Sequence, residues 1–470
     1  MPIKLHRHFI ITGIGVYLIS LLIVSLWFRP YALKPLWMAW GVGSVLFFFL
    51  LSYEMYRRWR HVDSRTFIRR TFWVALGLRM VYVGAIIFYY YAQTGVSFEY
   101  QAADSWSYHR MASFLAQLAR DGDFKTLFAV LRSSGSGFSD QGYLLYLTTL
   151  YTCFDNNILG PRLLKALMSA YTCVVVYKLA SRSLGEKTGR LAAVMAVFLP
   201  QFIHYTGTYM KETEMLFLAT LALERMDYLI QSKRYTFWNL LFPIVLTLMT
   251  FGFRTVIGIT LVLSFLVFVV LADKRFLTKK NRTIAVAAIV LTGLVVMLTP
   301  VGREIYFTIR ANTGTSNAMV EKYENLGLKY AEYACPKYMA PGAFVLPLTN
   351  LVEVANENQK MMNGTYFVKN WLGFFAMWCL VVAFREKKWR RLSLTGSYTL
   401  IYLLIIAFSF AFSSERYHFP ALPGLLIMAA FSMNCFRKKD FVFYYSYLAL
   451  LLIAIVSWNC LKLAGRGFIF

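Results

Sequence analysis

Ionisable residues that could do chemistry stand next to long apolar runs at widely separated places in the sequence. They are Asp104, Lys211, Glu212, Glu214, Arg254 and Arg416. A carboxylate can accept a proton from a hydroxyl group, and the planar guanidinium group of arginine can hold two oxygens of an anion. Each residue follows or precedes an apolar run that we expect to end on the same membrane face. A transporter would instead place its ionisable residues near the middle of the membrane. The pattern therefore indicates chemistry at a membrane surface.

The composition is typical of a membrane protein. Of the 470 residues, 58% are hydrophobic, which is far more than the core of a water-soluble protein needs. The net charge of +26 is concentrated in short clusters between apolar runs, as in cytoplasmic loops, where it would also attract anionic membrane lipids. No basic face is interleaved with aromatic residues in a soluble domain, so we expect no nucleic-acid partner. The six cysteines show no metal-binding spacing.

The apolar runs predict about thirteen membrane spans. They lie at about 9–28, 36–53, 71–92, 162–181, 188–206, 213–231, 236–251, 255–272, 283–300, 366–384, 396–413, 419–435 and 441–461. With the N-terminus inside, every strongly basic loop faces the cytoplasm, and the two long polar segments 93–161 and 301–365 share the other face. The apolar run 143–154 is too short to cross, so we expect a juxtamembrane or re-entrant segment.

The first outer segment contains two amphipathic patterns. After Asp104 and again after Asp123, apolar residues recur at the spacing of a helix with one apolar stripe. They are Met111, Phe114, Leu115 and Leu118, and then Phe124, Leu127, Phe128 and Leu131. Asp104 and Asp123 are well placed to cap these helices. We expect both helices to lie along the membrane surface.

One charge falls inside a predicted span. Arg79 lies in the middle of the third apolar run, where a charge is costly and usually faces the bundle interior or a water-filled cavity. The sequence identifies no partner for it.

Several of these segments together resemble the N-terminal half of GT-C-type glycosyltransferases. The resemblance rests on 104–112, 162–167, the Leu184-Gly185 loop, and Leu199-Pro200 leading into 209–214. It covers roughly residues 70 to 300, and the turn 415–420 extends it towards the end. Enzymes of this type are integral-membrane proteins that use polyprenyl-phosphate sugars, and the most similar branch is that of the protein mannosyltransferases and aminoarabinose transferases. Many mannosyltransferases have Asp-Glu in the first loop, whereas Ser105 follows Asp104 here.

The resemblance implies roles for the outer-face residues. The expected catalytic residues are Asp104, Glu212 and Glu214, and the last two occupy the place of an acidic pair that binds a divalent cation such as Mg²⁺ or Mn²⁺. Because a lipid-linked phosphate is already a weakly basic leaving group, the enzyme mainly needs a base for the acceptor hydroxyl and cations for the phosphate. We expect Asp104 to be the base. The cations expected at the donor phosphate are Arg416, Lys211 and Arg254. Supporting residues are Tyr417, His418 and His204.

Each residue also has a simpler alternative role. Asp104 could act only as a helix cap, and Glu212 and Glu214 could only favour a helix start, where the dipole is positive. Arg416 could anchor the protein at the interface. Arg254 could be a snorkelling residue at the end of a span.

The sequence therefore predicts an all-α polytopic membrane protein with a GT-C-like bundle of about thirteen transmembrane helices and extracytoplasmic juxtamembrane helices. Its expected parts are an N-terminal hairpin with a basic loop (1–70), a catalytic module (71–300) with the first outer loop (93–161), an extracytoplasmic segment (301–365) and C-terminal helices (366–470). In the plasma (inner) membrane it would transfer a sugar from a polyprenyl-phosphate donor to a lipid, glycan or protein acceptor, with inversion. Alternatives are a polysaccharide polymerase or ligase acting on lipid-diphosphate glycans, and a non-enzymatic lipid or glycan transporter.

Overall fold

The structure is a computed structural model. It describes residues 3–100, 102–133, 138–232, 234–271, 278–298, 302–303, 306, 342–353, 357–407 and 414–464. Most of the predicted outer segment 301–365 therefore lies outside the described residues. The described elements are helices, apart from one isolated antiparallel bridge between Ala32 and Val352. The predicted all-α class is confirmed.

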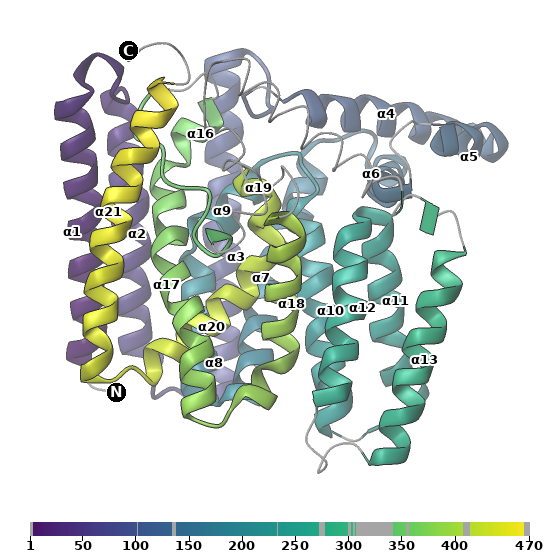
Figure 1. Cartoon of the computed structure of the whole chain (residues 1–470). Coiled ribbons are helices and arrows are strands. Elements are labelled where there is room, and N and C mark those ends of the chain that lie inside the picture. The colour runs from purple at the N-terminus through teal and green to yellow at the C-terminus, as the bar shows by residue number, and fades with distance from the viewer. Residues whose placement is uncertain are drawn as a thin grey trace.

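Most of the helices run along a common axis and form a bundle (Figure 1). They are α1 (Ile3–Trp27), α2 (Pro35–Trp59), α3 (Ser64–Thr94), α7 (Leu159–Leu184), α8 (Glu186–Phe198), α9 (Pro200–Gly207), α10 (Glu212–Ser232), α11 (Phe237–Phe253), α12 (Thr255–Leu271), α13 (Lys279–Met297), α17 (Asn363–Arg385), α18 (Trp389–Ala407), α20 (Leu422–Asn434) and α21 (Phe441–Ala464). Five further helices lie at its upper end in Figure 1. They are α4 (Ala103–Arg120), α5 (Phe124–Ser133), α6 (Phe138–Phe154), α16 (Glu357–Met361) and α19 (Glu415–His418).

Each predicted span coincides with a helix, except that 188–206 is divided into α8 and α9. Of the described helices, six are long and apolar enough to cross a membrane, namely α1, α2, α3, α7, α17 and α21. The helices α11 and α12 are apolar but shorter. The number of thirteen crossings stays a prediction.

The break between α8 and α9 explains the buried charge of Arg79. Pro200 has no N–H group, so it cannot bond to the carbonyl group of Ala196 one turn earlier. The Arg79 guanidinium, which is fully buried, donates to the Ala196 carbonyl at 3.1 Å and to the Val197 carbonyl at 3.3 Å. It also donates to Ser169 Oγ at 2.6 Å. Arg79 therefore faces the bundle interior, as predicted, and supplies the partners that the helix break removes.

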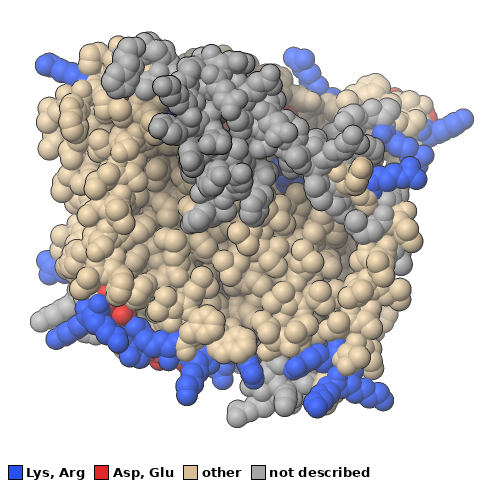
Figure 2. Space-filling view, viewed as in Figure 1, with Lys and Arg blue, Asp and Glu red and all other residues tan. Residues whose placement is uncertain are grey.

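Basic residues mark one end of the bundle. The start of α1, the end of α12, the start of α13 and the turn between α17 and α18 lie at the lower end in Figure 1, whereas the end of α21 lies at the upper end. Figure 2 shows Lys and Arg side chains gathered along the lower edge of the visible face, with a smaller number near α4 and α5. This distribution agrees with basic loops that share the cytoplasmic face.

The helices α4, α5 and α6 form a platform at the upper end of the bundle. They pack together through Leu115, Leu127, Leu131 and Leu144, and α6 lies beside them in Figure 1 rather than along the bundle axis. The two predicted amphipathic helices are thus present as α4 and α5. Asp123 caps α5, because its Oδ1 accepts a hydrogen bond from the Thr126 N–H at 3.0 Å.

Asp104 does not cap α4, and that prediction is wrong. The helix begins at Ala103, and Ala102 occupies the cap position without a side-chain hydrogen bond. The Trp106 N–H already donates to the Ala102 carbonyl at 2.8 Å, so Asp104 lies within the first turn. Its carboxylate is therefore free to point away from the helix end.

Candidate active site

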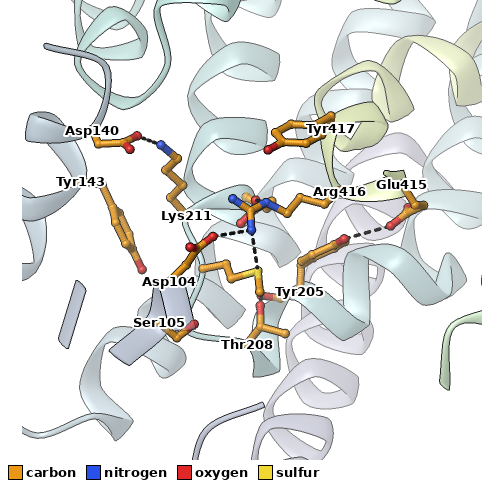
Figure 3. A network of polar contacts seen from close by, with 12 residues as sticks. Asp104, Ser105, Asp140, Tyr143, Tyr205, Thr208, Lys211, Glu415, Arg416 and Tyr417 are labelled. Atoms are coloured by element: carbon orange, nitrogen blue, oxygen red, sulfur yellow. Dashed lines mark hydrogen bonds and ion pairs between the residues drawn. The ribbon is translucent and has the colours of Figure 1, made fainter. Parts of the chain in front are cut away.

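Arg416 lies between two carboxylates that come from distant parts of the chain. The short helix α19 carries Arg416, and Figure 3 shows it pointing towards the first turn of α4. Its Nη1 lies 2.6 Å from Asp104 Oδ2, and its Nε lies 2.8 Å from Glu212 Oε1 at the start of α10. Burial opposes the charge of Arg416, but Glu212 and Asp104 outweigh it and raise the pKa of Arg416. Three of the predicted site residues therefore meet at the upper end of the bundle.

Asp104 and Glu212 differ in their access to solvent. The Asp104 side chain is 50% exposed, whereas the Glu212 side chain is 1% exposed. An acceptor molecule can therefore reach the Asp104 carboxylate more easily. Glu212 is better placed to hold Arg416 from the inner side.

The loop between α9 and α10 fixes the position of Glu212. The loop is buried, so its backbone polar groups need partners within the protein. The Lys165 Nζ donates to the Thr208 carbonyl at 3.0 Å and also to the Met210 carbonyl. The Tyr143 Oη donates to the Tyr209 carbonyl at 3.0 Å. Side chains from α6 and α7 thus hold the loop in one conformation.

Lys211 contacts a carboxylate that the sequence analysis missed. Its ammonium group forms an ion pair with Asp140 of α6 (Figure 3), and the Tyr108 Oη donates to the same carboxylate at 3.4 Å. Burial, together with the neighbouring Arg254, lowers the pKa of Lys211 to about 7. Burial also raises the pKa of Tyr108 to about 12. The sequence signal for Asp140 was an isolated acid at the start of the short apolar run, and it did not indicate a partner.

Glu214 faces a different cation from Glu212. Its Oε2 lies 3.6 Å from Lys165 Nζ, and both side chains are buried. Residues two apart on a helix do not face the same neighbour. Within the described residues, no group of three or more His, Cys, Asp or Glu side chains is arranged to hold a metal ion. Carboxylate oxygens are suitable ligands for Mg²⁺ or Mn²⁺. Binding of such an ion by Glu212 and Glu214 stays a prediction.

Arg254 differs from the other predicted cations in its partners. It follows α11, and its guanidinium group lies over the ring of Tyr417 at 4.4 Å. Arg416 lies over the same ring at 5.5 Å. In the part of the chain that the structure describes, Arg254 forms no ion pair with a carboxylate, unlike Arg416 and Lys211. The guanidinium group of Arg254 is therefore available to bind an anion beside Tyr417.

The two predicted histidines, His418 and His204, lie on different helices. His418 is buried in α19, two residues after Arg416. His204 lies on α9, where its Nδ1 is 3.1 Å from the Tyr82 Oη.

Glu415, the residue before Arg416, has no role predicted from the sequence. It is buried and accepts a hydrogen bond from Tyr205 at 2.9 Å. Burial raises the pKa of Glu415 to about 7.

One known protein family matches part of the chain. The family described as dolichyl-phosphate-mannose-protein mannosyltransferase matches residues 142–300. The resemblance to GT-C-type glycosyltransferases is confirmed. The matched residues include Lys211, Glu212, Glu214 and Arg254, whereas Asp104 and Arg416 lie outside them. The structure brings both of these next to the matched part.

A solved structure is also similar over most of the chain. It is the archaeal oligosaccharyltransferase AglB from Archaeoglobus fulgidus in complex with an inhibitory peptide and a dolichol-phosphate. The two proteins are 12% identical, with a TM-score of 0.45, and the alignment covers 88% of this chain. This chain spans 56% of the length of that protein. Comparison with curated proteins yields no sequence match.

Proposed function

We propose that the protein is a GT-C-type glycosyltransferase of the plasma (inner) membrane. It would take a sugar from a polyprenyl-phosphate donor and transfer it, with inversion, to a hydroxyl group of a lipid, glycan or protein acceptor on the extracytoplasmic face. The observation that carries the proposal is the meeting of Asp104, Glu212 and Arg416 at the end of the bundle opposite the basic loops. The match of residues 142–300 to the mannosyltransferase family supports the class of donor.

Asp104 is the proposed base. Its carboxylate is half-exposed, and Arg416 holds it in place through the contact of 2.6 Å. The acceptor oxygen would attack the anomeric carbon from the side opposite the phosphate. The new carbon–oxygen bond forms as the bond to the phosphate oxygen breaks, the hydroxyl proton moves to Asp104, and polyprenyl phosphate leaves with the bonding electron pair. A positioned base of this kind typically accelerates a reaction by about a hundred- to ten-thousand-fold.

Arg254 is the proposed ligand of the donor phosphate. Arg416 is already shared by two carboxylates, and Lys211 is paired with Asp140. A phosphate group could be held by the two parallel N–H groups of Arg254, which would stabilise the charge on the leaving group. Tyr417 would keep the guanidinium plane oriented, because the cation lies 4.4 Å from the ring centre.

A divalent cation remains part of the proposal. Glu212 and Glu214 would hold Mg²⁺ or Mn²⁺ in exchange for their present contacts with Arg416 and Lys165, and the ion would supply additional positive charge beside the phosphate. Reversible loss of transfer in excess chelator would support this role. Full activity in chelator, with Glu214→Gln also active, would leave the two acids as structural partners of Arg416 and Lys165.

The class of reaction can be tested on the purified protein in detergent with radiolabelled polyprenyl-phosphate sugars. A glycosyltransferase releases unlabelled polyprenyl phosphate and moves the label to the acceptor. A transporter leaves the glycosyl–phosphate bond intact, which would contradict the proposal. Activity with lipid-diphosphate glycans alone would instead support a polymerase or ligase.

A further inference from the structure

Glu99 connects the two elements that carry the site carboxylates. It lies shortly before α4 and is 3% exposed. Its Oε1 accepts a hydrogen bond from the Ser105 hydroxyl, and its Oε2 accepts one from the Tyr209 N–H at 3.1 Å. Ser105 is the neighbour of Asp104, and Tyr209 lies in the buried loop that leads into Glu212. One buried carboxylate thus spans the gap between the first turn of α4 and the start of α10.

The buried Glu99 side chain has partners within the protein. A buried carboxylate is costly unless its oxygens have hydrogen-bond partners and an opposite charge is near. Both oxygens have a donor, and Arg162 supplies the opposite charge nearby. Arg162 is itself held in place, since it donates to the Ser97 carbonyl at 2.6 Å and lies 5.4 Å from the centre of the Tyr209 ring. These contacts fix the positions of the groups that connect Ser105 to Tyr209 through Glu99.

Two polar contacts tie the first turn of α4 to the rest of the site. Ala102 provides no side-chain cap, and the Trp106 ring of this turn packs on the Phe98 ring at 4.4 Å between ring centres. The two polar contacts are the Asp104–Arg416 ion pair and the Ser105–Glu99 hydrogen bond, and Glu99 in turn reaches the loop between α9 and α10 through the Tyr209 N–H. A displacement of about 1 Å at a reacting group can cost about a hundredfold in rate.

We infer that Glu99 and Ser105 are positioning residues that set the place of Asp104 relative to Glu212 and Arg416. This inference rests on the proposed function, in which Asp104 is the base. Glu99 acts on the reaction through Ser105 and Tyr209, and it does not touch the substrate. It therefore affects the turnover rate rather than donor binding.

The test compares two serines of the same helix. Ser105→Ala removes the hydroxyl that bonds to Glu99, whereas Ser107→Ala changes an exposed serine. We expect Ser105→Ala to lower kcat about tenfold or more, with the donor KM within about twofold of wild type. Ser107→Ala should keep the wild-type values. Wild-type kcat for Ser105→Ala, in an assay where the wild-type protein is active, would overturn the inference and leave the proposed function standing.

A double-mutant cycle separates positioning from general stability. If Ser105 acts through the Asp104 carboxylate, Ser105→Ala should cause little further loss of kcat in a protein that already carries Asp104→Asn. The full independent loss in that background would overturn the inference. Glu99→Gln supplies a second check, because its amide oxygen can accept from Tyr209 and its amino group can donate to Ser105. We expect Glu99→Gln to keep more of the wild-type kcat than Ser105→Ala does, and the reverse order would contradict the role assigned to the connection.

Discussion

Arg416 carries one positive charge between the carboxylates of Asp104 and Glu212, and this arrangement decides what each cation at the site can do. The residue types indicated the chemistry: acids and arginines beside apolar runs were predicted to meet on one face, and Asp104, Glu212 and Arg416 do. The pairing could not be predicted, because sequence spacing does not show that Asp140 lies against Lys211 or that Arg254 has no acidic partner among the described residues. For that reason the proposed phosphate ligand is Arg254 rather than Arg416.

Substitution of the two arginines should therefore affect different kinetic constants. Arg254→Gln should raise the KM for the polyprenyl-phosphate donor about tenfold or more, since hydrogen bonds to charged groups contribute about 1.5–3 kcal/mol, with a smaller change in kcat. Arg416→Lys keeps the charge but cannot hold two carboxylates with one planar group, so it should mainly lower kcat. Steady-state kinetics with Arg110→Gln, an exposed cation of α4, as the control would measure both. Weaker donor binding in Arg416→Lys, with Arg254→Gln unchanged, would return the phosphate role to Arg416.

Local periodicity predicted the platform helices well, because an apolar stripe with the helical period needs a surface on which to pack. The cap of α5 by Asp123 follows the same local logic. The start of α4 does not follow this local logic, since Asp104 does not cap the helix. Its carboxylate instead pairs with the guanidinium group of Arg416, which is 312 residues away in the chain. Tertiary contacts of this kind also explain why Arg79 has no partner in the sequence but several in the structure.

The contact between α6 and the loop between α9 and α10 predicts a change in pH dependence. Asp140→Asn removes the negative charge beside Lys211, so the pKa of Lys211 should fall below about 7. If the charged form of Lys211 is needed, the high-pH limb of the kcat/KM profile should move to lower pH, by about one unit or more. Asp121→Asn, in the exposed turn after α4, is the matched control. A high-pH limb that stays in place in Asp140→Asn would show that this ion pair does not tune the site.

The break between α8 and α9 predicts a stability change that does not involve the substrate. Arg79→Met would leave the Ala196 and Val197 carbonyls buried without the donors that Arg79 supplies, and each such group costs about 1–3 kcal/mol. We expect a lower thermal unfolding midpoint for Arg79→Met in detergent. Arg70→Met, an exposed substitution on the same helix, should leave the midpoint unchanged. Equal midpoints for the two variants would contradict the role given to Arg79.

The arrangement of the whole chain follows from its apolar runs and basic clusters. The predicted runs coincide with helices because a single apolar segment in a membrane can satisfy all its backbone hydrogen bonds internally as a helix. The start of α1 and the end of α21 lie at opposite ends of the bundle in Figure 1, which agrees with the predicted odd number of crossings. What the pattern could not show is which of the shorter helices cross completely, since length and composition identify six spans among the described helices.

Cysteine labelling can test this topology. In a background without native cysteines, a membrane-impermeant thiol reagent added outside should modify Asp121→Cys in the platform. It should not modify Lys187→Cys, exposed in the first turn of α8, or Lys387→Cys, exposed in the turn after α17, which both lie at the basic end. Permeabilised cells should label all three positions. Labelling of Lys187→Cys in intact cells would mean that α6 crosses the membrane and would move the site to the other face.

The most direct test of the proposed mechanism is single-turnover transfer by Asp104→Asn. The side chain of Asp104 is half-exposed and does not cap α4, so the substitution should preserve the fold and the binding of the polyprenyl-phosphate sugar. It removes the carboxylate that would take the acceptor proton. We predict a folded protein that binds the donor as the wild type does but transfers the sugar at least about a hundred times more slowly. Transfer at a near wild-type rate would contradict the assignment of Asp104 as the base.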